Sequence, residues 1–222
     1  MMSHGRAPRA LSHGGHDMTA GAGHWDEVYT KKAVDAVSWY RPHLDRSLEL
    51  IAEAALSPDA PILDVGGGAS TLPRDLLDRG YTDVSVLDIS AAAIERAKEV
   101  VGADAARVHW LVGDVTTVAL PAARYALWHD RAVFHFLTDE AARAAYIDQV
   151  TRALAPGGRI IVATFGPDGP EKCSGLPVVR YDDAGLQRQF GAAFERVHCL
   201  AETHTTPWGS TQAFVYCLCR RV

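Results

Sequence analysis

The chain has 222 residues, which is the size of one ordinary domain and leaves no room for a second full one. Apolar residues make up 48% and charged residues 22%, so the composition supports a compact core and excludes global disorder. The 22 Lys and Arg residues against 27 Asp and Glu residues give a net charge of -5, which excludes the basic surface of a nucleic-acid-binding protein. Because no run reaches the roughly 18 apolar residues of a membrane helix and no secretory signal is found, we expect a cytoplasmic protein that binds no membrane.

The first 23 residues are rich in small and polar residues and show no apolar periodicity. They cannot bury enough surface to offset the entropy lost on ordering, so we predict a disordered leader over residues 1–23 and one domain over residues 24–222. Met18 directly precedes the first interpretable segment and is a candidate for the true start. Helical spacing of apolar residues before Pro58 predicts a helical segment over residues 24–58.

From Pro61 onward, short apolar strands alternate with helical segments. One of these helices has Ser90 as its predicted cap and Gly102 as its stop. Such alternation predicts an α/β fold with a doubly wound, mostly parallel sheet. Two further strands near the end, separated by a short turn-rich link, predict an antiparallel hairpin that closes one edge and brings the sheet to seven strands. The predicted strands are 61–65, 84–88, 108–112, 125–129, 159–165, 194–201 and 211–219.

All four cysteines lie in the last quarter of the chain, with no C-x-x-C pair and no spacing typical of zinc ligands. We therefore expect reduced thiols and predict no metal site. Cys217 and Cys219 share one face of a predicted strand, and small buried hydrophobic side chains are the simplest interpretation. Cys173, in a predicted loop over residues 171–177, is the cysteine that we expect to be the most exposed.

Three consecutive glycines follow the first predicted strand, and Asp88 ends the second strand about twenty residues later. This pattern suits a dinucleotide or an adenosyl cofactor, because the glycines allow a ligand to approach the backbone and the carboxylate can accept hydrogen bonds from ribose hydroxyls. Two residues argue against a dinucleotide. Thr71 stands where the G-x-G-x-x-G pattern needs Gly or Ala, and the negative charge of Asp64 would lie near a pyrophosphate.

Four stretches resemble, in order and spacing, the class I S-adenosylmethionine-dependent methyltransferases. They are LDVGGGAS at residues 63–70, VLDIS at 86–90, VGDV at 112–115 and LAPGGR at 154–159. The resemblance covers about residue 24 to the end and implies a Rossmann-like fold, S-adenosylmethionine as cofactor and S-adenosylhomocysteine as product. It implies that Asp64 and the glycines hold the methionine part, Asp88 the ribose, and Asp114 with Val115 the adenine. The expected cofactor-binding residues are Trp25, Tyr29, Trp39, Asp64, Gly66, Gly67, Gly68, Asp88, Ile89, Asp114, Val115 and His129.

The helical segment before the first strand carries aromatic residues, among them Trp25, Tyr29 and Trp39. In this fold that segment lies over the cofactor as a lid, and aromatic faces there would attract a sulfonium by cation–π contact. Ordinary packing of an amphipathic helix against the sheet is the alternative interpretation.

The segment over residues 128–137, at the end of the fourth strand, is the richest in chemistry. Methyl transfer from a sulfonium is an in-line displacement, which needs a general base only when the acceptor arrives protonated. His129 is a candidate general base or a polar wall of the methionine pocket, and His135 is a second candidate base. Asp130 and Arg131 could pair with each other or with substrate. For each of these four candidates, a structural role in the core stays open.

Two subgroups of the family compete for the substrate. The segment His129–Arg131 and the loop over residues 173–177, followed by residues 181–190, resemble bacterial thiopurine and tellurite-type methyltransferases. The motifs WDEVY at residues 25–29 and SWY at 38–40, with the loop DVGGGAS at 64–70, resemble a group that contains protein-lysine methyltransferases of elongation factor and citrate synthase. We favour a small-molecule acceptor, namely a thiol, chalcogen or metalloid species, because no docking extension is evident. A protein-lysine N-methyltransferase, an NAD-dependent oxidoreductase and a noncatalytic cofactor-binding module are the alternatives, and the oligomeric state is left open.

Overall fold

The structure is a computed structural model, and it describes residues 19–31 and 33–222. Residues 1–18, which include Met18 and most of the predicted leader, lie outside the described residues. The first helix begins at Thr19, so the last five residues of the predicted leader, 19–23, are helical. Within the described part, no helix is both long enough and apolar enough to cross a membrane.

The order of the elements follows the predicted alternation of strands and helices. Ser90 caps its helix by accepting a hydrogen bond from the Ala93 amide, as expected from the sequence. The helices are α1 (Thr19–Lys31), α2 (Asp45–Glu53), α3 (Leu72–Asp78), α4 (Ala91–Val101), α5 (Glu140–Ala153) and α6 (Asp183–Phe190), with short 3-10 turns at η1 (Val34–Ala36), η2 (Gly102–Arg107), η3 (Phe134–Phe136) and η4 (Gly191–Ala193). The strands are β1 (Ile62–Val65), β2 (Val84–Asp88), β3 (Val108–Val112), β4 (Tyr125–Arg131), β5 (Leu154–Phe165), β6 (Lys172–Cys173), β7 (Leu176–Pro177), β8 (Phe194–Thr205) and β9 (Thr211–Arg221).

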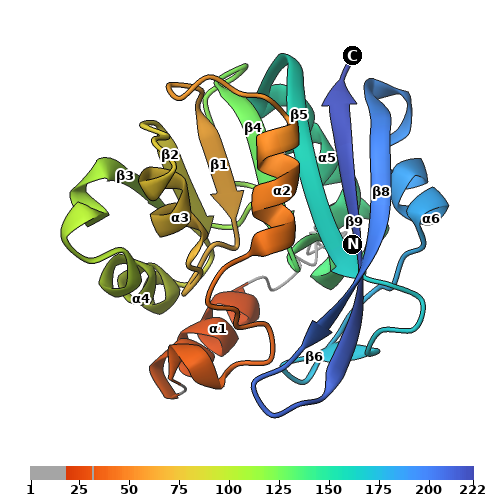
Figure 1. The fold of residues 1–222 in the computed structure, drawn as a ribbon. Helices are drawn as coiled ribbons and strands as arrows, with labels where there is room; N and C mark the ends of the chain where they lie inside the picture. The colour runs from red at the N-terminus through yellow and green to blue at the C-terminus, as the bar shows by residue number, and fades with distance from the viewer. Residues whose placement is uncertain (1–18, 32) are drawn as a thin grey trace, which may run out of the picture.

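Seven strands form one sheet in the order β3-β2-β1-β4-β5-β9-β8, as Figure 1 shows. Strands β1 to β5 are parallel, whereas β9 pairs antiparallel with both β5 and β8. The predicted doubly wound sheet with an antiparallel C-terminal hairpin is therefore confirmed. The strand order reverses between β1 and β4, and the crevice beyond the carboxyl ends of these two strands is where open α/β sheets bind ligands.

Helices cover both faces of the sheet and create two hydrophobic cores. Leu48, Leu76 and Ile94 belong to the core beneath α2, α3 and α4, whereas Tyr146 and Leu186 belong to the core beneath α5 and α6. The central strands β1 and β2 are buried at every position, which explains why their sequences are nearly continuous apolar runs. The sheet thus forms a rigid platform that fixes whatever side chains stand at its carboxyl edge.

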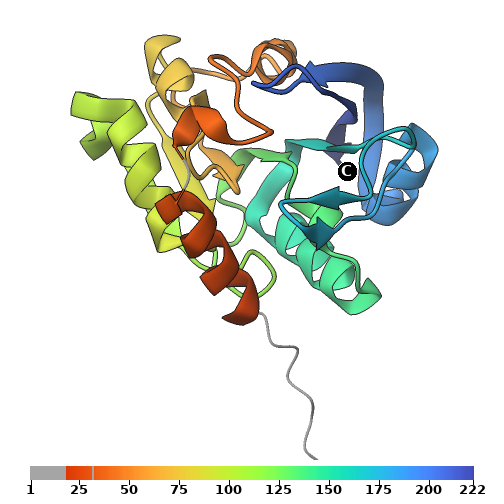
Figure 2. The same cartoon turned by 90° about the horizontal axis from the view of Figure 1, so that it is seen from below.

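Two peripheral elements lie beyond the carboxyl edge of the parallel strands. Figure 2 looks onto this edge and shows α1 on one side and the small β6–β7 hairpin on the other. The predicted loop over residues 171–177 is this hairpin, in which Cys173 pairs with Leu176. A ligand bound at the strand ends would therefore lie between α1 and the hairpin.

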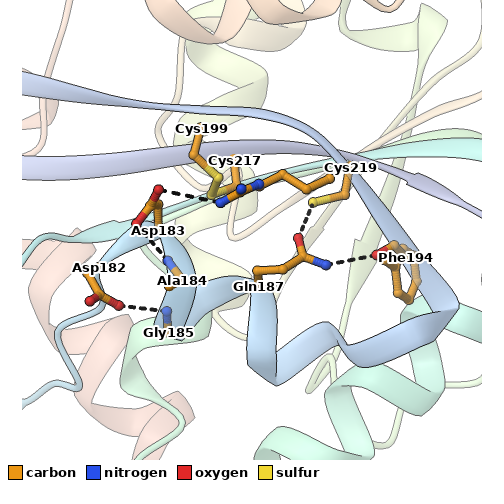
Figure 3. Close-up of a disulfide and its surroundings, with 10 residues drawn as sticks. Asp182, Asp183, Ala184, Gly185, Gln187, Phe194, Cys199, Cys217 and Cys219 are labelled. Atoms are coloured by element: carbon orange, nitrogen blue, oxygen red, sulfur yellow. Dashed lines mark hydrogen bonds and ion pairs between the residues drawn. A yellow bond between two sulfur atoms is a disulfide. The ribbon is translucent and has the colours of Figure 1, made fainter.

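The expectation of reduced thiols is wrong for two of the four cysteines. Cys199 of β8 lies directly opposite Cys217 of β9, with 4.1 Å between their Cα atoms, and the two form a disulfide (Figure 3). Cys219 keeps its thiol, which contacts the Gln187 side chain of α6, and burial raises its pKa to about 11. The alternation along one strand tells which side chains share a face, but only the register of the hairpin tells which residue lies opposite.

Candidate active site

The first component of the site is a carboxylate at the end of β1. Asp64 is buried, and its Oδ1 atom lies 2.7 Å from Nδ1 of His129 on the neighbouring β4. The other ring nitrogen of His129 lies 2.8 Å from the Ser47 hydroxyl of α2. Oδ2 of Asp64 is buried and has no hydrogen-bond partner in the described structure. A buried carboxylate oxygen of this kind fits a cationic ligand such as an ammonium group.

The three glycines after β1 are needed for steric reasons that differ at each position. Gly66 has a φ of +65°, and a Cβ there would lie 2.0 Å from the Val133 side chain. A Cβ at Gly67 would lie 2.5 Å from Oδ2 of Asp64, so it would cover the unpartnered oxygen. A Cβ at Gly68 would lie 2.8 Å from the Tyr29 hydroxyl oxygen, and the Gly68 amide donates a hydrogen bond to Asp88 across 3.0 Å. The loop thus leaves the Asp64 carboxylate open and links it to the end of β2.

Asp88 ends β2 beside this loop. Its Oδ2 atom accepts the Gly68 hydrogen bond, and its Oδ1 atom accepts a second one from the Ser90 amide at 2.9 Å. Burial raises the pKa of Asp88 to about 6, against the opposing effect of these two hydrogen bonds. Each carboxylate oxygen keeps a lone pair for a further donor, so this group could accept hydrogen bonds from two ribose hydroxyls.

Asp114 follows β3 and has two roles in the structure. Its Oδ1 atom accepts hydrogen bonds from the amide and the hydroxyl of Thr116, at 2.8 and 2.7 Å, which makes it the anchor of a local turn. It also lines the main cavity, together with Ile89 and Val115. The structure therefore brings Asp88, Ile89, Asp114 and Val115 together at one end of that cavity, which we call the adenosine end.

The aromatic residues of the predicted lid meet above the glycine loop. The Trp25 ring lies 6.3 Å from the Tyr29 ring and 5.9 Å from the Trp39 ring, measured between centroids. Burial raises the pKa of Tyr29 well above its usual value, with a further contribution from the charge of Asp88. Asp26 joins α1 to the start of α4 by accepting hydrogen bonds from the Ser90 hydroxyl and the Ala92 amide. The lid is thus fixed beside the adenosine end.

The main cavity has a volume of about 290 Å³ and extends from the adenosine end to a second, mostly apolar end. We call the second end the acceptor end. It is lined by Trp39, Arg131, Phe136, Cys173, Leu176 and Pro177. A smaller cavity of about 40 Å³ adjoins it around Asp64, with Arg41, Ser70 and Thr71 among its lining residues. We call this smaller cavity the methionine end, after the part of the cofactor that the family resemblance places at Asp64.

Cys173 lies in the acceptor end and is buried, not exposed as the sequence had suggested. The β6–β7 hairpin turns its side chain toward the strand ends, where it belongs to the same apolar core as Phe165 and Phe214. Phe136, Leu176 and Pro177 also line this end and are not among the site residues predicted from the sequence. The sequence indicated their role only through their positions in the predicted segments 128–137 and 171–177.

The four candidate catalytic residues occupy different places. Arg131 lines both cavities, and His129 lines the methionine end with both ring nitrogens hydrogen-bonded. Asp130 is fully buried on the opposite face, where it accepts hydrogen bonds from the Tyr146 hydroxyl at 2.6 Å and from the amides of Val133 and Phe134. Asp130 therefore holds the turn after β4 and does not reach either cavity.

His135 is also buried and lines neither cavity. Its Nδ1 atom accepts a hydrogen bond from the Phe165 amide at 3.3 Å, so the ring proton lies on Nε2. Burial lowers the pKa of His135 to about 3, with a smaller contribution from the charge of Arg131. A histidine held in this way is neutral at physiological pH and is separated from the cavity by the turn that it supports.

Comparisons with known proteins show that the chain is similar to methyltransferases. The model of a methyltransferase domain matches residues 62–158. The eEF1A lysine and N-terminal methyltransferase of Mus musculus is 30% identical over 141 residues, which cover 63% of this chain and 20% of that protein. The chain spans about a fifth of the length of the curated relatives of this kind that it matches.

Solved structures show the same fold at low sequence identity. A SAM-dependent methyltransferase from Anabaena variabilis has a TM-score of 0.71 and 14% identity, covering 92% of this chain and 94% of that chain. The 1,6-didemethyltoxoflavin-N1-methyltransferase of Burkholderia thailandensis, with bound 1,6-didemethyltoxoflavin and S-adenosylhomocysteine, has a TM-score of 0.65 and 19% identity, covering 98% and 93%. The matched methyltransferase domain, the glycine loop and this sheet make the chain similar to SAM-dependent methyltransferases, whose fold it shares.

Proposed function

We propose that this chain transfers the methyl group of S-adenosylmethionine to a small, soft nucleophile, namely a thiol, chalcogen or metalloid species. The observation that supports this proposal is the character of the acceptor end. Aromatic and aliphatic side chains form most of its lining, and none of its six lining residues is a carboxylate. A lysine ammonium entering there would lose water without meeting a counterion, which is unfavourable. A polarisable sulfur or selenium atom suits this environment better.

The cofactor would be held by the residues that the geometry brings together. S-adenosylmethionine supplies a methyl group activated by a positively charged sulfur. We propose that Asp64 binds the ammonium of the methionine part, because its Oδ2 atom is buried and unpartnered beside the open Gly67 position. Asp88 would accept hydrogen bonds from the ribose, and Asp114 with Val115 would contact the adenine. The aromatic lid would exclude water from the reacting atoms.

A protein-lysine N-methyltransferase is the second candidate. The observation in its favour is the 30% identity to the mouse eEF1A lysine and N-terminal methyltransferase, although this chain corresponds to only a fifth of that protein. Lysine methylation requires that the ammonium lose a proton first, since its usual pKa is about 10.4. The acceptor end offers no carboxylate or histidine for that task.

Incubation with radiolabelled S-adenosylmethionine would separate the two candidates. The panel contains thiols, a selenol, metalloid oxyanions, and an elongation factor with its lysines unmodified. We expect the label to appear in a small thiol or chalcogen compound. Label found only in the protein would overturn the proposal in favour of the second candidate, and tight cofactor binding without any labelled product would indicate a noncatalytic module.

A further inference from the structure

Arg131 carries a positive charge that no carboxylate in the described part of the chain neutralises. Its Nε atom donates a hydrogen bond to the Tyr216 hydroxyl at 2.8 Å, and its Nη1 atom donates to the Trp39 carbonyl at 3.1 Å. The guanidinium lies 4.8 Å from the centroid of the Phe214 ring. All three partners are uncharged, and the buried Nη2 atom has no partner among the described residues. A half-buried cation with an unused donor fits an anion that arrives from the cavity.

The position of Arg131 favours the acceptor as the source of that anion. Arg131 ends β4 and lines both the methionine end and the acceptor end. The methionine end has other donors for the cofactor carboxylate, namely Arg41 and the hydroxyls of Ser70 and Thr71. In the acceptor end, Arg131 is the one cationic side chain among the six lining residues.

Apart from the Cys173 thiol, which the Cys173→Ser variant below tests, the six residues of the acceptor end include no side chain that could act as a general base. Trp39, Phe136 and the two residues of β7 have no group that accepts a proton near neutral pH. Both ring nitrogens of His129 are already hydrogen-bonded to Asp64 and Ser47. An acceptor that must be deprotonated by the enzyme would find no partner there, whereas an acceptor that arrives ionised would need only a positive charge.

We propose that the acceptor is methylated as an anion, with its charged group bound by the free N–H of Arg131, and that no general base takes part. This inference rests on the proposed function and narrows its substrate class to thiolates, selenolates and related anions. The acceptor sulfur forms a bond to the methyl carbon while the bond from that carbon to the sulfonium breaks. The electron pair of the broken bond stays on the departing sulfur, so both products are neutral thioethers and no proton is released.

The pKa values of the titratable groups around Arg131 determine the pH range in which methylation of an anionic acceptor can be tested. Burial lowers the pKa of His204 on β8 to about 4 and that of His135 to about 3, while burial raises the pKa of Tyr216. The charges of Glu202 and Arg41 lie near the same network. Burial raises the pKa of two carboxyl groups to about 6, those of Asp88 at the adenosine end and of Asp130 behind the turn after β4.

The first experiment varies the acceptor at saturating cofactor. With alkyl and aromatic thiols of different acidity, the rising limb of kcat/KM against pH should follow the pKa of each free thiol, because the thiolate is the reacting form. The same limb in kcat should lie at lower pH, since Arg131 favours the ionised thiol in the complex. The Cys173→Ser variant should keep both limbs. A limb that stays at one pH for every thiol would indicate an enzyme base and overturn the proposal.

The second experiment changes the charge. Arg131→Met should lower kcat/KM for a thiolate by about 10- to 100-fold, as expected for loss of a charge-assisted hydrogen bond, and should raise the pKa seen in kcat. Arg131→Lys should restore part of the loss. Arg220→Gln is the matched control, because Arg220 pairs with the exposed Glu195 at the opposite end of the sheet. Calorimetry of the S-adenosylhomocysteine complex should show that Arg131→Met weakens binding of a thiolate and not of its S-methyl product.

Binding of the cofactor without an acceptor shows whether Arg131 binds the acceptor or the cofactor carboxylate. If Arg131→Met weakens S-adenosylhomocysteine but leaves an analogue without the carboxylate unaffected, Arg131 serves the cofactor carboxylate and the inference fails. The proposed function itself fails in a different way, when the wild-type chain labels no small nucleophile at all.

Discussion

Asp64 is the residue on which cofactor recognition depends most directly. One of its oxygens is bound to His129, and the other is buried and unpartnered beside the glycine loop. Asp64→Asn keeps the shape and removes the negative charge, so affinity for S-adenosylmethionine should fall by about 10- to 100-fold, the size of a hydrogen bond to a charged group. Titration calorimetry measures this change, with exposed Asp59→Asn as the control. Equal affinity in both variants would contradict the assignment.

Asp88 should make cofactor binding dependent on pH. Burial raises its pKa in the ligand-free protein to about 6, so the carboxyl is largely protonated below that pH and cannot accept hydrogen bonds from both ribose hydroxyls. Affinity for S-adenosylhomocysteine should therefore increase as the pH rises from about 5 to 7 and stay level above, with a change approaching tenfold per pH unit well below the pKa. Asp88→Asn should bind more weakly and lose this dependence. An unchanged slope in the variant would assign the effect to another group.

Among the elements, α1 is joined to the start of α4 by the Asp26 carboxylate, a polar contact that can be removed. Asp26 accepts hydrogen bonds from the Ser90 hydroxyl at 2.6 Å and from the Ala92 amide at 3.2 Å. Asp26→Ala should loosen the lid and speed dissociation of S-adenosylhomocysteine about fivefold, the equivalent of about 1 kcal/mol. Stopped-flow fluorescence of Trp25 measures the rate. Glu27→Ala on the same helix, which removes an exposed pair with Lys31, should leave it unchanged.

The elements were more predictable from the sequence than the contacts between them. Buried parallel strands such as β1 and β2 appear as apolar runs, and Ser90 marks a helix start by local hydrogen bonding, so short-range patterns were sufficient. The partner of the His129 Nε2 atom, in contrast, is Ser47, a residue 82 positions away on an amphipathic helix with no distinguishing motif. Asp130 and His129 are adjacent, yet they point to opposite faces of β4, where one supports a turn and the other supports the site.

For the whole molecule, the C-terminal hairpin joins the edge of the fold to the site. Tyr216 of β9 holds Arg131, and on the edge strand β8, His204 and Glu202 hold Arg41 of the segment between α1 and α2. Strand β8 has a sheet neighbour on one side only, so its position depends on β9. The same hairpin carries the Cys199–Cys217 disulfide.

Reduction of this disulfide should therefore destabilise the folded chain without removing cofactor binding. The bond closes a loop with a sequence separation of 18 residues, and constraining the unfolded chain over such a loop contributes about 3 kcal/mol. Urea unfolding with and without dithiothreitol should show a lower midpoint under reducing conditions. Cys199→Ala should reproduce that lower midpoint and make it insensitive to dithiothreitol, whereas Cys173→Ser should keep the difference. Affinity for S-adenosylhomocysteine should change little, because Cys217 faces α6 while Tyr216 faces Arg131 on the opposite side of the sheet. Identical midpoints in the two buffers would show that the bond does not constrain the native hairpin.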